Sequence, residues 1–210
     1  MDDRKLRRAM SARALMRKKF KVMSFSGPWK ESFGESLEPS GVWIVWGNSG
    51  NGKTRFCMQL AKYLTRFGKV AYDTMEEGAR LTFQKALVDS HMEQAKGFVV
   101  LDREPLADLK ARLRKRNSPD IVIVDSFQHM GLSKPKYLKL KGEFPDKLFV
   151  FVSHAEGKQP EGRSAKFVRY DADVKIRVEG YRALPTSRYG GGRPYVIWEE
   201  GAADYWGEAE

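Results

Sequence analysis

Cysteine is nearly absent from this sequence, and long apolar runs are absent altogether. Cys57 is the only cysteine among the 210 residues, which excludes an internal disulfide and a cysteine-based metal cluster. No segment has the apolar length that a membrane-spanning helix needs, and the basic N-terminus lacks the apolar core of a signal peptide. These absences predict a soluble, cytoplasmic protein that does not enter a membrane.

Repeats and low-complexity segments are also missing, and acidic residues are outnumbered by basic ones. The 38 lysines and arginines exceed the 27 aspartates and glutamates, which gives a formal net charge of +11. Such an excess suits a polyanionic partner but does not distinguish nucleic acid from an anionic membrane surface or an acidic protein. A chain of this length with 41% apolar residues can bury one core and is short for two domains. We therefore expect one α/β domain.

The first 22 residues form a segment of distinct composition. Nine of them are lysines or arginines, and leucine, methionine and alanine are interleaved with these at partly helical spacing. We predict a basic amphipathic arm over residues 1–22 and a folded domain over residues 23–210. The arm is compatible with a solvated terminus and equally with docking on a neighbouring subunit, a nucleic acid or an acidic protein.

Apolar runs alternate with helical patterns along the folded domain. Strands are predicted at residues 41–46, 69–74, 98–101, 121–125 and 148–152, and helices at residues 56–64, 79–91 and 106–116. Runs that are apolar throughout are typical of a parallel sheet covered by helices on both faces. From residue 172 apolar and charged residues alternate, which predicts an antiparallel extension. Its strands are expected at 172–179 and near 195–198, with the glycine-rich residues 189–194 turning between them.

Residues 47 to 54 match the phosphate-binding pattern G-x-x-x-x-G-K-[ST] at every fixed position. The pattern lies between a predicted buried strand and a predicted helix. Its glycines let the backbone wrap around an anion, so that successive N–H groups and the helix N-terminus point at the phosphates. Lys53 is expected to reach the β- and γ-phosphates, and Thr54 to ligate Mg²⁺. The predicted nucleotide-binding residues are Gly47, Asn48, Ser49, Gly50, Asn51, Gly52, Lys53, Thr54 and Arg55.

Further polar residues follow the predicted strands, at the edge where open parallel sheets bind ligands. Asp125 closes the fourth apolar run and is predicted to hold Mg²⁺ beside Thr54. Glu76 and Glu77 follow the second run, and either carboxylate is suited to activate the water that attacks the γ-phosphate. His154 follows the fifth run and is suited to sense the γ-phosphate.

The order of these motifs resembles the ATPase core of the RecA superfamily, in particular its RadA-like and DnaB-like branches. The stretch VAYDTMEEG is similar to the family strand that ends in the catalytic glutamate, which assigns that role to Glu76. IVIVDSFQHM is similar to the Walker B segment, with its acidic residue at Asp125. The stretch beginning FVSHAEG is similar to the family segment that starts with a sensor histidine, at His154, and continues into a basic loop at roughly residues 155–169.

This resemblance covers about residues 25 to 200 and implies a stand-alone, minimal RecA-like P-loop NTPase. The implied fold is a mostly parallel twisted sheet flanked by helices, and the implied cofactors are ATP and Mg²⁺. TSRYGG resembles the family motif K-N-R-F-G, whose basic residues reach a neighbouring subunit's ATP, and so places a trans-acting arginine at Arg188. The family lysine falls on Thr186, a departure from the motif. The short segment after Asp125 predicts an abbreviated helix.

In RecA-like assemblies, rings or filaments, the loops after the fourth and fifth strands hold the DNA backbone. Cations in flexible, glycine-bearing loops suit phosphate contacts that do not depend on base sequence. The residues predicted to contact nucleic acid are Lys134, Lys136, Lys158, Arg163, Lys166 and Arg169, and Lys139 and Lys141 lie in the same segments. Trp43, Trp46 and Trp198 lie in apolar runs and are expected in the core rather than stacked on bases.

The sequence therefore predicts an ATP-hydrolysing, oligomeric protein that acts on DNA in recombination, replication or a mobile-element process. The alternative is a nucleotide-dependent regulatory switch that binds a protein partner, with the basic arm docking on an acidic surface. A small-molecule kinase would have a comparable phosphate loop, but the order of the later motifs disfavours it.

Overall fold

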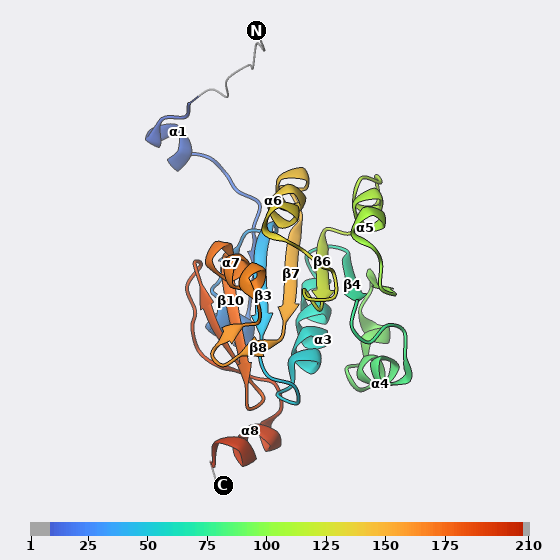
Figure 1. Ribbon diagram of the computed structural model, residues 1–210. Helices are drawn as coiled ribbons and strands as arrows, with labels where there is room; N and C mark the ends of the chain where they lie inside the picture. The colour runs from blue at the N-terminus through green and yellow to red at the C-terminus, as the bar shows by residue number, and fades with distance from the viewer. Residues whose placement is uncertain (1–8, 208–210) are drawn as a thin grey trace.

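An eight-stranded sheet runs through the computed structural model, which describes residues 9–207 of the chain (Figure 1). Its strands are β3 (Gly41–Trp46), β4 (Val70–Thr74), β5 (Phe98–Leu101), β6 (Ile121–Asp125), β7 (Leu148–Ser153), β10 (Val174–Glu179), β11 (Arg182–Ser187) and β12 (Tyr195–Val196). Their order across the sheet is β12-β11-β10-β3-β7-β6-β4-β5. The strands from β10 to β5 pair in parallel, whereas β11 and β12 pair antiparallel. The predicted parallel sheet with a C-terminal antiparallel extension is confirmed.

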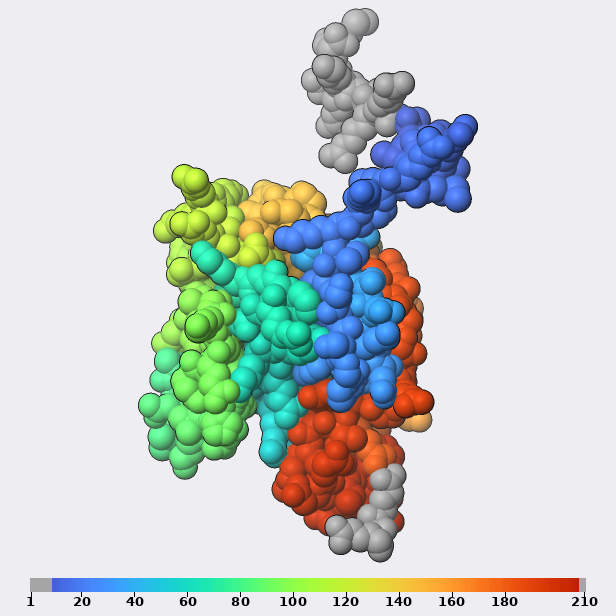
Figure 2. Space-filling model, turned by 180° about the vertical axis from the view of Figure 1, so that it is seen from behind, coloured from blue at the N-terminus to red at the C-terminus, as the bar shows by residue number. Residues whose placement is uncertain are grey.

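Helices cover both faces of this sheet. One face carries α2 (Gly27–Phe33), α3 (Lys53–Leu64), α4 (Leu81–Asp89) and the short 3-10 helix η1 (Met92–Gln94). The other face carries α5 (Leu106–Leu113), α6 (Lys134–Glu143) and α7 (Arg163–Asp171). In Figure 1, α6 and α7 lie in front of the sheet, and Figure 2 shows the blue and teal N-terminal half of the chain on the opposite side.

The strands bury both of their faces because successive side chains point to opposite sides. In β3, Trp43 and Val45 pack into the core beneath α3, while Ile44 and Trp46 pack into the core beneath α7. The expected core positions of Trp43 and Trp46 are confirmed. The prediction for Trp198 is wrong: its side chain is 36% exposed, because it precedes the C-terminal helix α8 (Glu199–Trp206) instead of continuing a strand.

The antiparallel extension differs from its prediction. The partner of β10 is β11, which follows a tight turn at Gly180 and Tyr181, whereas the predicted strand near 195–198 contributes only the two-residue β12. Pro185 in the middle of β11 hid this strand in the sequence, since proline interrupts a central strand. It is tolerated because β12 pairs with β11 only at Arg182 and Ala183, which leaves the outer edge at Pro185 without a described neighbour.

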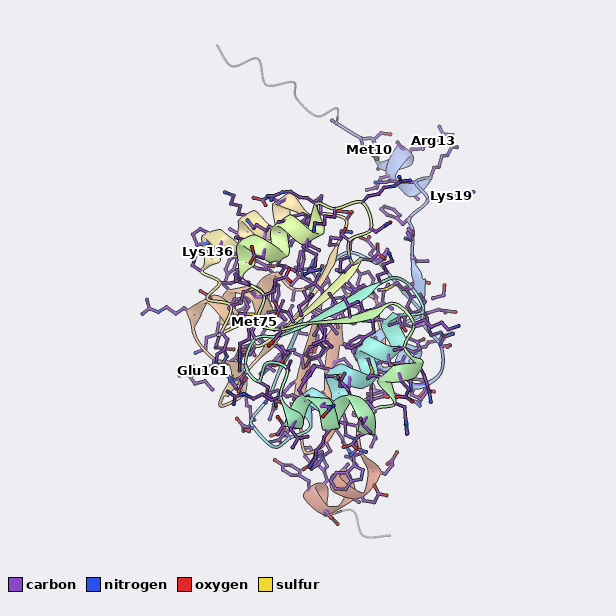
Figure 3. The ribbon with its side chains drawn as sticks, turned by 90° about the vertical axis from the view of Figure 1, so that its right-hand side faces the viewer. Met10, Arg13, Lys19, Met75, Lys136 and Glu161 are labelled. Carbon is purple, nitrogen blue, oxygen red and sulfur yellow. The ribbon has the colours of Figure 1, made fainter. Side chains whose placement is uncertain are left out.

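The remaining elements are short. They are α1 (Ala12–Met16), the paired strands β1 (Met23–Ser24) and β2 (Ser36–Leu37), and the paired strands β8 (Ala155–Glu156) and β9 (Gln159–Pro160). Residues 9–22 are exposed, and α1 projects from the body, as the labels of Met10, Arg13 and Lys19 show in Figure 3. The predicted arm residues 1–8 lie outside the described residues. Across residues 9–207, each helix is too short or too polar to cross a bilayer.

A close approach at the end of α2 yields the first prediction. Gly34 has a φ of +100°, and a Cβ there would lie 2.2 Å from the carbonyl oxygen of Tyr189. Gly34→Ala is expected to lower the free energy of unfolding by more than about 2 kcal/mol, because backbone strain adds to the clash. Urea denaturation measures the loss. Gly190→Ala is the matched control, since Gly190 has a φ of +95° and open space around it. Equal losses in both variants would contradict the role given to the Tyr189 contact.

Candidate nucleotide-binding site

The phosphate loop joins β3 to α3, and its glycines are required by its shape. Gly50 and Gly52 have φ values of +76° and +91°, in the region that favours glycine. A Cβ on Gly47 would lie 2.2 Å from the carbonyl oxygen of Val178 in β10. The loop therefore packs closely against β10 and still presents a backbone free of side chains, as an anion cradle needs.

Side-chain hydrogen bonds fix the same loop in position. The Asn51 side chain accepts from the N–H of Gly180 at 2.8 Å and donates to the carbonyl oxygen of Ser49 at 3.1 Å. The first bond ties the loop to the turn between β10 and β11. Asn51 therefore has a structural role within a motif position that tolerates any residue.

The ammonium group of Lys53 is the principal cation of the loop. Its Nζ donates to the carbonyl oxygen of Asn48 at 2.9 Å. Burial lowers the pKa of Lys53, and the nearby Asp125 opposes that shift. A desolvated ammonium group held by a backbone oxygen would gain from a bound anion. The loop therefore fits a phosphate.

A cavity of about 290 Å³ opens beside the phosphate loop. Lys53 and Thr54 line it from α3, Asp125 from the end of β6, and Glu76 and His154 from the loops after β4 and β7. The carboxyl ends of parallel strands meet at one edge of a sheet, which is why residues far apart in sequence converge there. Apart from Arg188, the structure brings together every residue predicted to be catalytic or to hold Mg²⁺.

Asp125 is held by its neighbour in the sheet. Its Oδ2 accepts a hydrogen bond of 2.5 Å from the hydroxyl of Tyr72 in β4. Burial raises the pKa of Asp125, while the Tyr72 bond and Lys53 act in the opposite direction. A buried carboxylate gains from a cation, and the Asp125 carboxylate with the Thr54 hydroxyl offers the hard oxygen ligands that Mg²⁺ prefers. The residues present therefore fit Mg²⁺.

The two candidate bases occupy different surroundings. Glu76 Oε2 lies 3.2 Å from Nε2 of His154. Glu77 Oε2 instead accepts from the hydroxyl of Thr82 in α4 at 3.0 Å. Because the Glu76 carboxylate is paired with the predicted sensor histidine and the Glu77 carboxylate is turned to α4, the geometry favours Glu76 as the base.

A loop after β5 braces the backbone that carries these glutamates. Arg103 donates to the carbonyl oxygens of Glu76 and Glu77 at 3.2 and 2.7 Å. Its neighbour Asp102 accepts from the N–H of Ala79 at 3.0 Å. Sequence reasoning missed Arg103, since a single arginine after a strand belongs to no motif. We interpret it as a positioning residue for Glu76.

This brace yields a second prediction. Arg103→Ala is expected to lower kcat for ATP hydrolysis about tenfold and to leave KM within about twofold, because a shift in Glu76 affects the reaction more than nucleotide binding. Steady-state kinetics measures both constants. Arg80→Ala removes a nearby exposed arginine and serves as the control. A rise in KM with unchanged kcat would contradict the positioning role.

Arg188 lies away from the cavity of its own chain. Its Nη1 is 3.1 Å from Oδ1 of Asp173, and the N–H of Asp173 donates to the carbonyl oxygen of Val42 near the start of β3. The phosphate loop follows the other end of β3, so Arg188 is at the opposite edge of the sheet. Both Arg188 and Thr186 are exposed. Arg188 is therefore placed where a neighbouring chain, and not its own phosphate loop, can meet it.

The cation-rich segments are mostly helical, which corrects their assignment to loops. Lys134, Lys136, Lys139 and Lys141 lie in α6, Arg163, Lys166 and Arg169 lie in α7, and Lys158 lies in the turn between β8 and β9. The helix predicted to be abbreviated, α6, spans ten residues. Ala165 and Val168 bury one face of α7 in the core, a helical spacing that the surrounding basic residues concealed.

Several of these cations already have partners. Lys166 Nζ lies 2.7 Å from a carboxylate oxygen of Glu156. Lys134 Nζ lies 4.2 Å from the ring centre of Phe167, and the Arg169 guanidinium lies over the Trp46 ring. Within the described part of the chain, Lys136, Lys158 and Arg163 are exposed and form no ion pair. Figure 3 shows Lys136 on the same side of the molecule as Glu161, which precedes α7.

Two aromatic residues border the site that sequence reasoning did not place there. Tyr181 lines the cavity and packs edge-on against Trp198, with ring centres 5.0 Å apart. The Arg55 guanidinium lies 5.4 Å from the Trp198 ring centre. Arg55, predicted as part of the nucleotide-binding set, is therefore exposed and held beside the cavity by this stacking.

Comparison with known proteins adds the fold relationship. No family model matches the sequence, and no curated protein matches it. The structure is similar to that of the flagellar accessory protein FlaH from Methanocaldococcus jannaschii, with a TM-score of 0.59, 15% identity, and coverage of 86% of this chain and 96% of that chain. It is also similar to the solved ATPase domain of a second protein, with a TM-score of 0.51, 14% identity, and coverage of 75% of this chain and 80% of that domain. The chain has the RecA-like P-loop ATPase fold.

Proposed function

We propose that this chain, built on the RecA-like P-loop fold, is a cytoplasmic ATPase that works on DNA as a homo-oligomer. The observation that supports hydrolysis most strongly is the convergence of Lys53, Thr54, Asp125 and Glu76 around one cavity. A cradle for phosphates, oxygen ligands for Mg²⁺ and a carboxylate base are the parts that phosphoryl transfer to water requires.

Each residue has a defined task in this proposal. The loop N–H groups and Lys53 bind the phosphates, and Thr54 with Asp125 holds Mg²⁺, which neutralises phosphate charge when bound. Glu76 orients the attacking water and accepts its proton. His154, whose Nε2 is 3.2 Å from the Glu76 carboxylate, holds that carboxylate toward the cavity.

The link to DNA is supported by charge and connectivity. The net charge is +11, and exposed cations lie on the segments that directly follow the site. Gln128, in the loop after β6, donates to the Ser153 hydroxyl at 2.7 Å and to the carbonyl oxygen of Glu161 at 3.1 Å. These bonds connect the end of β7 to the start of α7. A change at His154 can thereby shift the α7 cations and alter the grip on a phosphate backbone.

A regulatory switch that binds a protein is the second candidate. The ion pair of Lys166 with Glu156 reduces the charge available for nucleic acid. The exposed arm at residues 9–22 offers a separate docking element for an acidic protein. Similarity to FlaH, a flagellar accessory protein, is compatible with this class of function.

Steady-state ATP hydrolysis with and without single-stranded and double-stranded DNA tests the proposal. We expect hydrolysis that Lys53→Ala abolishes and that DNA stimulates, with the stimulation declining as salt rises. The double variant Lys158→Ala, Arg163→Ala should lose the stimulation. The control, Lys85→Ala with Lys96→Ala, removes two exposed lysines from the opposite helix layer and should keep it. Hydrolysis indifferent to DNA would favour the switch, and hydrolysis unaffected by Lys53→Ala would overturn the site.

A further inference from the structure

Two imidazoles and a carboxylate converge beside the phosphate loop. Glu76, His129 and His154 each offer one ligand atom, and these atoms all lie within 4.8 Å of one another. They come from three loops, which follow β4, β6 and β7. The ATPase proposed above has no use for His129. We propose that this cluster is a second metal site, which binds a transition-metal ion such as Zn²⁺ separately from the Mg²⁺ site at Thr54 and Asp125.

The donor atoms decide the class of metal. Two imidazole nitrogens and a carboxylate oxygen form a borderline-soft set that suits Zn²⁺ and its neighbours, whereas Mg²⁺ selects oxygen ligands. Three protein ligands leave a fourth tetrahedral position open to solvent. The cluster therefore differs in chemistry from the oxygen ligands of Thr54 and Asp125.

The distances are close to those of a tetrahedral site. Zinc bonds of about 2.0 to 2.1 Å put neighbouring ligand atoms roughly 3.3 Å apart. The Glu76 and His154 ligand atoms are already 3.2 Å apart. The third ligand must approach from at most 4.8 Å. Because Glu76 and His129 are exposed at the cavity rim, rotation of their side chains closes this gap without moving the sheet.

Supporting contacts orient the ligands. The Ser126 hydroxyl lies 2.7 Å from Nδ1 of His129. With the proton on Nδ1, this bond fixes the ring and leaves the lone pair of Nε2 for a metal ion. The N–H of Glu76 donates to the carbonyl oxygen of Asp125 at 3.1 Å, which holds the Glu76 loop against β6. Such outer contacts are typical of metal-binding histidines and carboxylates.

Metal binding has a consequence for hydrolysis that rests on the proposed function. A bound Zn²⁺ occupies the carboxylate of Glu76, which then no longer accepts a proton from water. The phosphate loop is left free, so nucleotide still binds. Zn²⁺ is therefore an inhibitor of turnover that acts on the base and not on the phosphate cradle.

Zinc binding is tested first on the untagged, nucleotide-free full chain, by competition with a chromophoric chelator. We expect one Zn²⁺ per chain. His129→Ala should weaken the affinity at least tenfold, and Ser126→Ala should weaken it about tenfold through loss of ring orientation. His91→Ala is the matched control, because His91 is the third histidine of the chain and lies outside the cluster. Absence of stoichiometric binding, or equal binding by His129→Ala, overturns the site.

The second arm measures hydrolysis at saturating Mg²⁺ and ATP with free Zn²⁺ buffered. Zinc should inhibit the wild-type protein and His91→Ala, and the fractional inhibition should be lost in His129→Ala. Binding without inhibition supports the metal site and overturns its effect on Glu76. Because the first arm uses no nucleotide, failure of the ATPase proposal does not affect its result.

Discussion

Glu76→Gln keeps ATP binding and lowers kcat by about 10²- to 10⁴-fold, the range expected when a general base is removed. The amide has the shape of the carboxylate but does not accept a proton from water. The substitution leaves the phosphate loop untouched, since the Glu76 side chain contacts His154 and not the loop. Titration with a fluorescent nucleotide measures binding, and single-turnover hydrolysis in zinc-free buffer measures the chemical step.

Glu77→Gln is the matched control for this prediction. The Glu77 carboxylate accepts from the Thr82 hydroxyl in α4, so its replacement should change kcat by no more than a few-fold. A loss of turnover in Glu77→Gln with near-normal turnover in Glu76→Gln would transfer the catalytic role to Glu77. It would also remove the inhibitory effect expected of Zn²⁺ at Glu76.

The phosphate loop and the parallel strands were predictable because their determinants are local. Positive φ at Gly50 and Gly52 and an apolar run on both faces of β3 are encoded in neighbouring residues. The convergence of Asp125 with Lys53 was also predictable, since parallel strands align their carboxyl ends. These features need no knowledge of side-chain contacts between distant segments.

Features that depend on distant contacts were missed. The brace from Arg103 to the carbonyl oxygens of Glu76 and Glu77 joins two loops, and no local pattern marks it. His129 meets His154 only because β6 and β7 are neighbours in the sheet. The strand β11 was hidden by Pro185, which a free outer edge makes acceptable. In each case the arrangement of other strands decides what the residue does.

Arg188→Ala is expected to reduce ATP hydrolysis by about 10³-fold or more if the arginine stabilises charge on a neighbour's nucleotide. Its position at the sheet edge opposite its own phosphate loop rules out action in cis. Mixing this variant with Lys53→Ala, itself inactive, should restore part of the activity. A Lys53→Ala subunit supplies Arg188 to the intact phosphate loop of its neighbour, and random mixing in equal amounts puts about a quarter of the interfaces in this productive arrangement.

Arg193→Ala is the control for Arg188, because Arg193 is also exposed and forms its ion pair, with Glu31, at 3.2 Å. It should keep near-normal hydrolysis. Arg188 also pairs with Asp173, whose backbone joins the start of β3, so its loss has a structural explanation to set against the trans role. Thermal denaturation separates the two. A lowered melting temperature without rescue at any mixing ratio assigns Arg188 to the packing of its own chain, whereas rescue at an unchanged melting temperature requires a nucleotide site shared between subunits.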